Sequence, residues 1–153
     1  MQRREVIGEP DASGLRIAIA VSEFNAPITA GLLEGATAAL EEAGCEAVDV
    51  VWVPGAFELP LIARRLGEGD YDAVVAIGAV IEGETDHYAH ISAQAASGLM
   101  RASLEAGVPV TFGVLTVRDA EHAAARSKPG PGNKGAEAAW AAVKAAQVLR
   151  QIS

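Results

Sequence analysis

The chain has 153 residues, of which half are apolar and 5% aromatic, and its formal net charge is −8 at pH 7. This length predicts one domain with a sizeable core, and the acidic balance argues against nucleic acid and anionic membranes as partners. No apolar run reaches the ~20 residues that span a bilayer. The single cysteine, Cys45, excludes an intrachain disulfide and favours a cytoplasmic location.

Residues 1–13 are mostly polar and contain Gly8 and Pro10, so we expect an extended N-terminal arm followed by a single domain over residues 14–153. In that domain, β-rich apolar runs alternate with segments of helical periodicity. The predicted strands are Arg16–Val21, Ala47–Val53, Ala73–Ile81 and Val108–Thr116. The predicted helices are Ile28–Ala43, Phe57–Leu66, Asp86–Ala106, Ala120–Arg126 and Asn133–Ile152.

The alternation of strands and helices predicts an α/β fold with a parallel sheet that is covered on both faces. Ligands of such sheets bind beyond the carboxyl ends of the strands. That rule selects four segments, which are Glu23–Pro27, Pro54–Glu58, Ile81–His87 and Val117–Asp119.

The third of these segments combines groups that can hold an anion and move a proton. A turn that leads into a helix leaves amide N–H groups free, Thr85 adds a hydroxyl, and His87 adds an imidazole. The alternative is an ordinary helix start that Asp86 caps. A metal pair of His87 and His90 is conceivable, but no third ligand is apparent.

Aromatic and acidic residues accompany the other strand ends. Glu58 could accept hydrogen bonds from a polyol or an amine, or it could only complement the dipole of a helix. Phe24 could stack on a flat ring or belong to the core, and Phe112, inside the fourth predicted strand, fits the core.

Two cations flank the segment 128–132, in which two prolines and two glycines cannot continue a helix. Arg126 and Lys134 could form an anion clamp or could simply cap helix ends. This glycine-rich segment lacks the spacing of a nucleotide-binding loop.

Taken together, these segments resemble the lumazine synthase family of riboflavin biosynthesis. The matching blocks keep their order and spacing over nearly all of residues 15–150. They are Phe24–Asn25, Leu32–Ala36, Val53–Pro60, Gly78–His87, Thr111–Thr116 and Gly132–Gly135 with Glu137.

The resemblance implies a flavodoxin-like three-layer α/β/α sandwich with a four-stranded parallel sheet. It implies the condensation of 5-amino-6-(D-ribitylamino)uracil with 3,4-dihydroxy-2-butanone 4-phosphate, without a metal or an organic cofactor. It also implies a homo-oligomer, either a pentamer or a sixty-subunit icosahedral shell, whose active sites lie between adjacent subunits. Riboflavin synthase is a candidate partner.

The resemblance also assigns residues to the ribitylaminouracil substrate. Phe24 would stack on the pyrimidine ring, while Phe57 and Glu58 would help to hold the ribityl chain and the ring. Asn25 would play a supporting role. The full set is Phe24, Ala56, Phe57, Glu58, Ala79, Val80, Ile81 and, from the neighbouring subunit, Phe112.

The butanone phosphate would meet a second set of residues. Glu84 and Thr85 would contact the phosphate through backbone amides and a hydroxyl, and His87 would be the proton donor. Arg126 of the neighbouring subunit would bind the phosphate. Lys134 and Glu137 would support the wall of the site that the neighbouring subunit provides.

Three positions depart from the family pattern. Glu82 stands where the family usually has a basic residue, Glu23 replaces a frequent arginine, and Asp86 replaces a frequent proline. Together with Glu84, Glu82 and Asp86 surround the proposed phosphate site with negative charge, which should weaken phosphate binding unless the side chains point away.

Two other functions remain open from the sequence. One is a self-assembling shell or scaffold of the same fold with weak catalysis. The other is a flavodoxin-like module that binds a flavin or a sugar phosphate without turnover. The enzyme is favoured because the residues needed for the chemistry are present.

Overall fold

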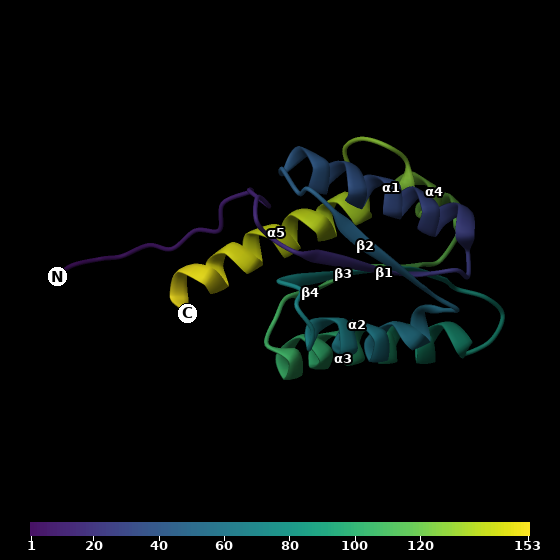
Figure 1. Cartoon of the computed structure of the whole chain (residues 1–153). Coiled ribbons are helices and arrows are strands. Elements are labelled where there is room, and N and C mark those ends of the chain that lie inside the picture. Colours follow the sequence, from purple (N-terminus) through teal and green to yellow (C-terminus); the bar gives the residue numbers. More distant parts are fainter.

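A computed structural model describes all 153 residues of the chain (Figure 1). The strands are β1 (Ile17–Ser22), β2 (Val48–Val53), β3 (Ala73–Ile81) and β4 (Val110–Val117). The helices are α1 (Ala26–Glu42), α2 (Leu59–Gly67), α3 (His87–Ala106), α4 (Ala120–Ser127) and α5 (Lys134–Ile152), and a 3₁₀ turn, η1 (Ala56–Glu58), precedes α2. No helix has the length and apolar character needed to cross a membrane.

The four strands form one parallel sheet in the order β2-β1-β3-β4. Figure 1 shows α1, α4 and α5 on one face of the sheet and α2 and α3 on the other. The predicted α/β/α sandwich with four parallel strands is therefore confirmed. Because all strands run the same way, their carboxyl ends share one edge of the sheet.

The sheet separates two apolar cores. Ile19, Ile77 and Val143 belong to the core beneath α1 and α5, and Leu59 and Leu99 belong to the core beneath α2 and α3. β3 lies between β1 and β4, and eight of its nine residues are buried. The edge strand β2 is only partly covered, since Val50 and Trp52 are exposed, so the expected cover of both faces does not extend to this edge.

The helices α1 and α5 approach each other through glycines. A Cβ added at Gly135 would lie 1.9 Å from the carbonyl oxygen of Leu32, and one added at Gly35 would lie 2.1 Å from Asn133 Oδ1. Only glycine permits such contact. The start of α5 is therefore held closely against α1.

Asn133 fixes the turn between α4 and α5. Its side chain is buried, and its Nδ2 lies 3.1, 3.2 and 3.1 Å from the carbonyl oxygens of Gly31, Ser127 and Lys128. Its Oδ1 accepts from the amide of Ala136 at 3.0 Å and so caps α5. One side chain thus ties α1, the end of α4 and the start of α5 together.

Most elements begin and end within two residues of their predicted bounds, and β3 matches its prediction to the residue. β4 starts at Val110 instead of Val108. Gly107 ends α3 in the left-handed region with φ 74°, and Pro109 has no N–H to donate. Residues 1–13 contain no helix or strand, and part of this arm contacts α5 where the carbonyl of Ile7 accepts from Gln151.

Candidate active site

A cleft of about 380 Å³ lies at the carboxyl edge of the sheet. We call it the His87 cleft. It is bounded by the turn after β1, the segment between β2 and α2, and the first turns of α3. Its lining residues are Phe24, Pro54, Gly55, Ala56, Phe57, Glu58, His87 and Ile91. The structure therefore brings together five of the predicted site residues, namely Phe24, Ala56, Phe57, Glu58 and His87.

Two aromatic side chains of the cleft are turned toward solvent. Phe24 is 70% exposed and Phe57 is 56% exposed. Large apolar side chains are seldom left this open without a reason when they converge on one concavity. The alternative that Phe24 belongs to the core is therefore wrong, and both rings are free to contact a ligand.

The turn that carries Phe24 is fixed by three hydrogen bonds. The amides of Glu23 and Phe24 donate to the carbonyls of Val53 and Pro54 at 2.8 and 3.0 Å. Asn25 adopts a left-handed conformation with φ 65°, which asparagine tolerates better than most residues, and its Nδ2 donates to the carbonyl of Ala79 at 3.1 Å. The turn after β1 is thus tied to the ends of both neighbouring strands.

Glu58 offers a free carboxylate to the cleft. It ends η1, where its amide donates to the carbonyl of Gly55 at 3.2 Å, and its side chain is half-buried. The carboxylate forms no hydrogen bond or ion pair within the chain, and one oxygen lies near Gly55, 3.4 Å from the place where a Cβ would stand. This acceptor is available to a hydroxyl or an amine.

His87 begins α3 beside the cleft and is exposed. Its imidazole makes no hydrogen bond or ion pair. Its amide donates to the hydroxyl oxygen of Thr85 at 3.3 Å, whereas Asp86, at the N-cap position, makes no capping bond. The expectation that the Asp86 side chain caps the helix is therefore wrong, and the first helical amide is instead bonded by the hydroxyl of Thr85.

The floor behind the cleft is densely packed. Ala79 and Val80 are buried and Ile81 is half-buried, so these three predicted residues form part of β3 and are absent from the residues that line the cleft. A Cβ on Gly78 would lie 3.1 Å from Ser22 Oγ and 3.2 Å from Leu59 Cδ1. The buried hydroxyl of Ser22 has no hydrogen-bond partner. Ser22 was not among the predicted site residues, and the only feature that could have pointed to it is its place as a polar residue at the end of an apolar run.

The remaining predicted residues lie elsewhere on the chain. Glu84 and Thr85 are exposed in the loop between β3 and α3, and Phe112, on the edge strand β4, is 47% exposed, so its assignment to the core is wrong. Arg126 Nη1 donates to the carbonyl of His122 at 3.1 Å, and Lys134 Nζ lies 2.8 Å from Glu137 Oε2. None of these six residues lines the His87 cleft.

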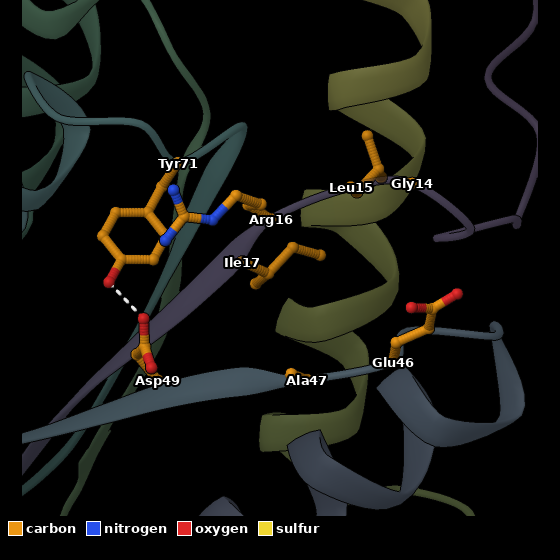
Figure 2. A pocket seen from close by; sticks show the side chains of 8 residues that line it. All are labelled: Gly14, Leu15, Arg16, Ile17, Glu46, Ala47, Asp49 and Tyr71. Carbon is orange, nitrogen blue, oxygen red and sulfur yellow. Dashed lines mark hydrogen bonds between the residues drawn. The ribbon is translucent and has the colours of Figure 1, made fainter.

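A second pocket, of about 300 Å³, lies at the opposite, amino edge of the sheet (Figure 2). Three of its four polar side chains, Arg16, Asp49 and Tyr71, interact with one another, and only Glu46 does not. The Tyr71 hydroxyl donates to Asp49, and the Arg16 guanidinium lies 5.1 Å from the centre of the Tyr71 ring. The bond to Asp49, with burial, raises the pKa of Tyr71. We call this region the Tyr71 pocket.

No group of three or more His, Cys, Asp or Glu side chains is arranged to hold a metal ion. His87 and His90 lie one helical turn apart without a third ligand. The free groups of the His87 cleft are instead suited to stacking, hydrogen bonding and proton transfer.

Comparisons with known proteins identify the family of the chain. Residues 14–150 match the family model described as 6,7-dimethyl-8-ribityllumazine synthase. The 6,7-dimethyl-8-ribityllumazine synthases of two strains of Thermus thermophilus are each 50% identical to the chain over 145 residues. The alignment covers 93% of this chain and 92% of each relative.

Proposed function

Since the chain belongs to the 6,7-dimethyl-8-ribityllumazine synthase family, it is a transferase of riboflavin biosynthesis, and we propose that its reaction takes place in the His87 cleft. The reaction condenses 5-amino-6-(D-ribitylamino)uracil with 3,4-dihydroxy-2-butanone 4-phosphate. It yields 6,7-dimethyl-8-ribityllumazine, phosphate and water. The observation that supports this site is the convergence of two exposed aromatic rings, a free carboxylate and a free imidazole on one cleft.

The ribitylaminouracil is the substrate whose chemistry suits the β1 and β2 side of the cleft. A flat pyrimidine offers a face on which the exposed ring of Phe24 can stack. The unpaired carboxylate of Glu58 can accept hydrogen bonds from the ribityl hydroxyls, with Phe57 beside it. We assign Ala56 and the end of β3, Ala79–Ile81, to the wall around this substrate.

The butanone phosphate is assigned to the start of α3. The first amides of a helix lack intrahelical partners and favour an anion, and Thr85 lies in the same turn. Glu84 would contribute through its backbone amide. A guanidinium can bind a phosphate through two parallel hydrogen bonds, which supports Arg126 for this role.

His87 is proposed as the group that moves protons. Imine formation, loss of phosphate and ring closure each need a proton delivered or removed, and imidazole does both near neutral pH. A cation on the phosphate aids its departure. The remaining contribution is the orientation of two small molecules, which needs no nucleophile.

We propose that a neighbouring subunit completes each site. Phe112 and Arg126 lie outside the cleft of their own chain, and Phe112 is exposed on an edge strand. This supports a homo-oligomer in which a neighbour contributes Phe112 and Arg126, with Lys134 and Glu137 behind them. We propose that this oligomer is a pentamer and that pentamers could build a sixty-subunit shell. Analytical ultracentrifugation tests the assembly. We also propose a cytoplasmic location and riboflavin synthase as a partner.

The activity is tested by mixing the purified protein with both substrates and following the absorbance of the lumazine product. We expect a rate well above that of the spontaneous condensation. A rate equal to the spontaneous one would contradict the enzyme and would favour a scaffold of the same fold. Heat-denatured protein is the control.

A further inference from the structure

The loop between β3 and α3 carries three acids that the proposed reaction does not use as carboxylates. Glu82, Glu84 and Asp86 are all exposed, and no lysine or arginine lies between them in the sequence. Glu84 and Asp86 form no ion pair. Glu82 is different, because its carboxylate has a cationic partner just beyond another strand.

That partner is Arg118, and the sheet places it there. β3 and β4 pair in parallel up to Ile81 and Val117, and the amide of Glu82 adds one more bond to the carbonyl of Val117 at 2.9 Å. Glu82 and Arg118 are therefore the next pair in register beyond the sheet. Opposite charges on adjacent strands attract, and Arg118 Nε lies 3.9 Å from Glu82 Oε2.

We propose that Arg118 is a positioning residue for the butanone phosphate. It offsets the charge of Glu82 and draws that carboxylate toward β4, so that the loop before His87 tolerates a phosphate. This inference rests on the proposed function, because it concerns the substrate assigned to that loop. Arg118 acts through Glu82 and is not itself assigned a contact with the phosphate.

The exposure of the Glu82–Arg118 pair indicates whether its effect should be sought in folding stability or in substrate binding. The side chain of Arg118 is 87% exposed, and exposed ion pairs add little to folding stability. Glu82 nevertheless belongs to the loop that is proposed to hold the phosphate, and charges act on one another over a Debye length of about 8 Å at physiological ionic strength. The pair should therefore change the KM for the butanone phosphate and leave folding almost unaffected.

The test uses R118Q, E82Q and the double variant E82Q/R118Q in the full-length enzyme. We expect R118Q to raise the KM for the butanone phosphate about fivefold, the size of a modest electrostatic coupling, and added salt to reduce this defect. We expect E82Q/R118Q to restore the wild-type KM, since no charge is left to offset. The KM for the ribitylaminouracil and the melting temperature should stay unchanged in all three variants.

Two results would overturn the inference. If R118Q had a wild-type KM, Arg118 would have no part in phosphate binding. If E82Q/R118Q were as defective as R118Q, Arg118 would act on the phosphate directly and not through Glu82. R101Q, which removes another exposed arginine that pairs with a glutamate, is the matched control and should behave as wild type. A wild-type protein without activity would instead contradict the proposed function.

Discussion

The two edges of the sheet carry pockets of similar size but of opposite character. In the Tyr71 pocket, Tyr71 pairs with Asp49, and Arg16 covers the tyrosine ring. In the His87 cleft, the imidazole of His87 and the carboxylate of Glu58 have no partner within the chain. Polar groups that are already paired satisfy one another within the fold, whereas convergent unpaired groups are available to a ligand. The pairing of their polar groups therefore distinguishes the candidate active site from the other pocket better than the pocket volumes do.

The largest expected effect tests the free imidazole. We expect His87→Ala to lower kcat by at least about 100-fold, because general acid–base groups contribute a factor of this size or more. The melting temperature should stay unchanged, since the imidazole is exposed and makes no bond. Steady-state kinetics and thermal unfolding measure the two quantities.

His90→Ala is the matched control for this variant. His90 is exposed on the same helix, one turn further on, and does not line the cleft. We expect its kcat to stay within about twofold of wild type, since surface substitutions away from functional groups have small effects. Equal losses in both variants would contradict the role of His87.

A buried group that is fully paired should show the opposite response. We expect Asn133→Ala to lower the free energy of unfolding by about 2–4 kcal/mol, because three carbonyls lose a donor and α5 loses its cap. Denaturant unfolding measures this loss. Asn133→Asp keeps the cap but removes the donors, so it should also destabilise; a wild-type stability in Asn133→Asp would show that the cap alone matters.

A smaller effect is expected from the cation assigned to the phosphate. We expect Arg126→Ala to raise the KM for the butanone phosphate about tenfold, since a charge-assisted hydrogen bond contributes about 1.5–3 kcal/mol. The KM for the ribitylaminouracil should not change. Lys128→Ala, which removes an exposed cation two residues away, serves as control. If saturation by the butanone phosphate were the same in both variants, the phosphate role of Arg126 would be wrong.

The smallest effect should come from the Tyr71 pocket. We expect Tyr71→Phe to leave kcat and both KM values unchanged, because its hydroxyl is already paired with Asp49. The raised pKa of Tyr71 favours its neutral form in the folded protein, so this contribution to stability is present below the ordinary tyrosine pKa and is lost as pH rises through the folded value. Spectrophotometric titration of Asp49→Asn should show the pKa of Tyr71 moving back down.

The sequence predicted the parts of the fold that depend on local pattern. The bounds of β3 were predicted to the residue because nine apolar or small residues lie between the acids Asp72 and Glu82. The start of β4 was missed because Pro109, near the beginning of an otherwise apolar run, has no backbone N–H to donate to the sheet. The absence of a side-chain cap on α3 was missed because Asp86 is a residue type that favours the N-cap position, while the adjacent Thr85 bonds the first helical amide instead.

The site was less accessible to sequence reasoning, since its contacts join segments far apart in the chain. The bond from Asn25 to Ala79 depends on β1 lying beside β3, and the pair of Glu82 and Arg118 depends on the register of β3 with β4. Neither strand order nor register can be read from hydrophobic periodicity. The exposure of Phe24 likewise depends on the turn geometry, because its apolar character fitted the core equally well.

The junction held by Asn133 has a consequence for the entropy of ligand binding. Because three carbonyls share one buried donor, the turn between α4 and α5 cannot shift by small steps without losing several bonds together. Arg126 and Lys134 are thus presented from a scaffold that folding has already ordered. Residues 82–86 beyond the β3 ladder have far fewer bonds, so the conformational freedom lost on binding should come mainly from that loop.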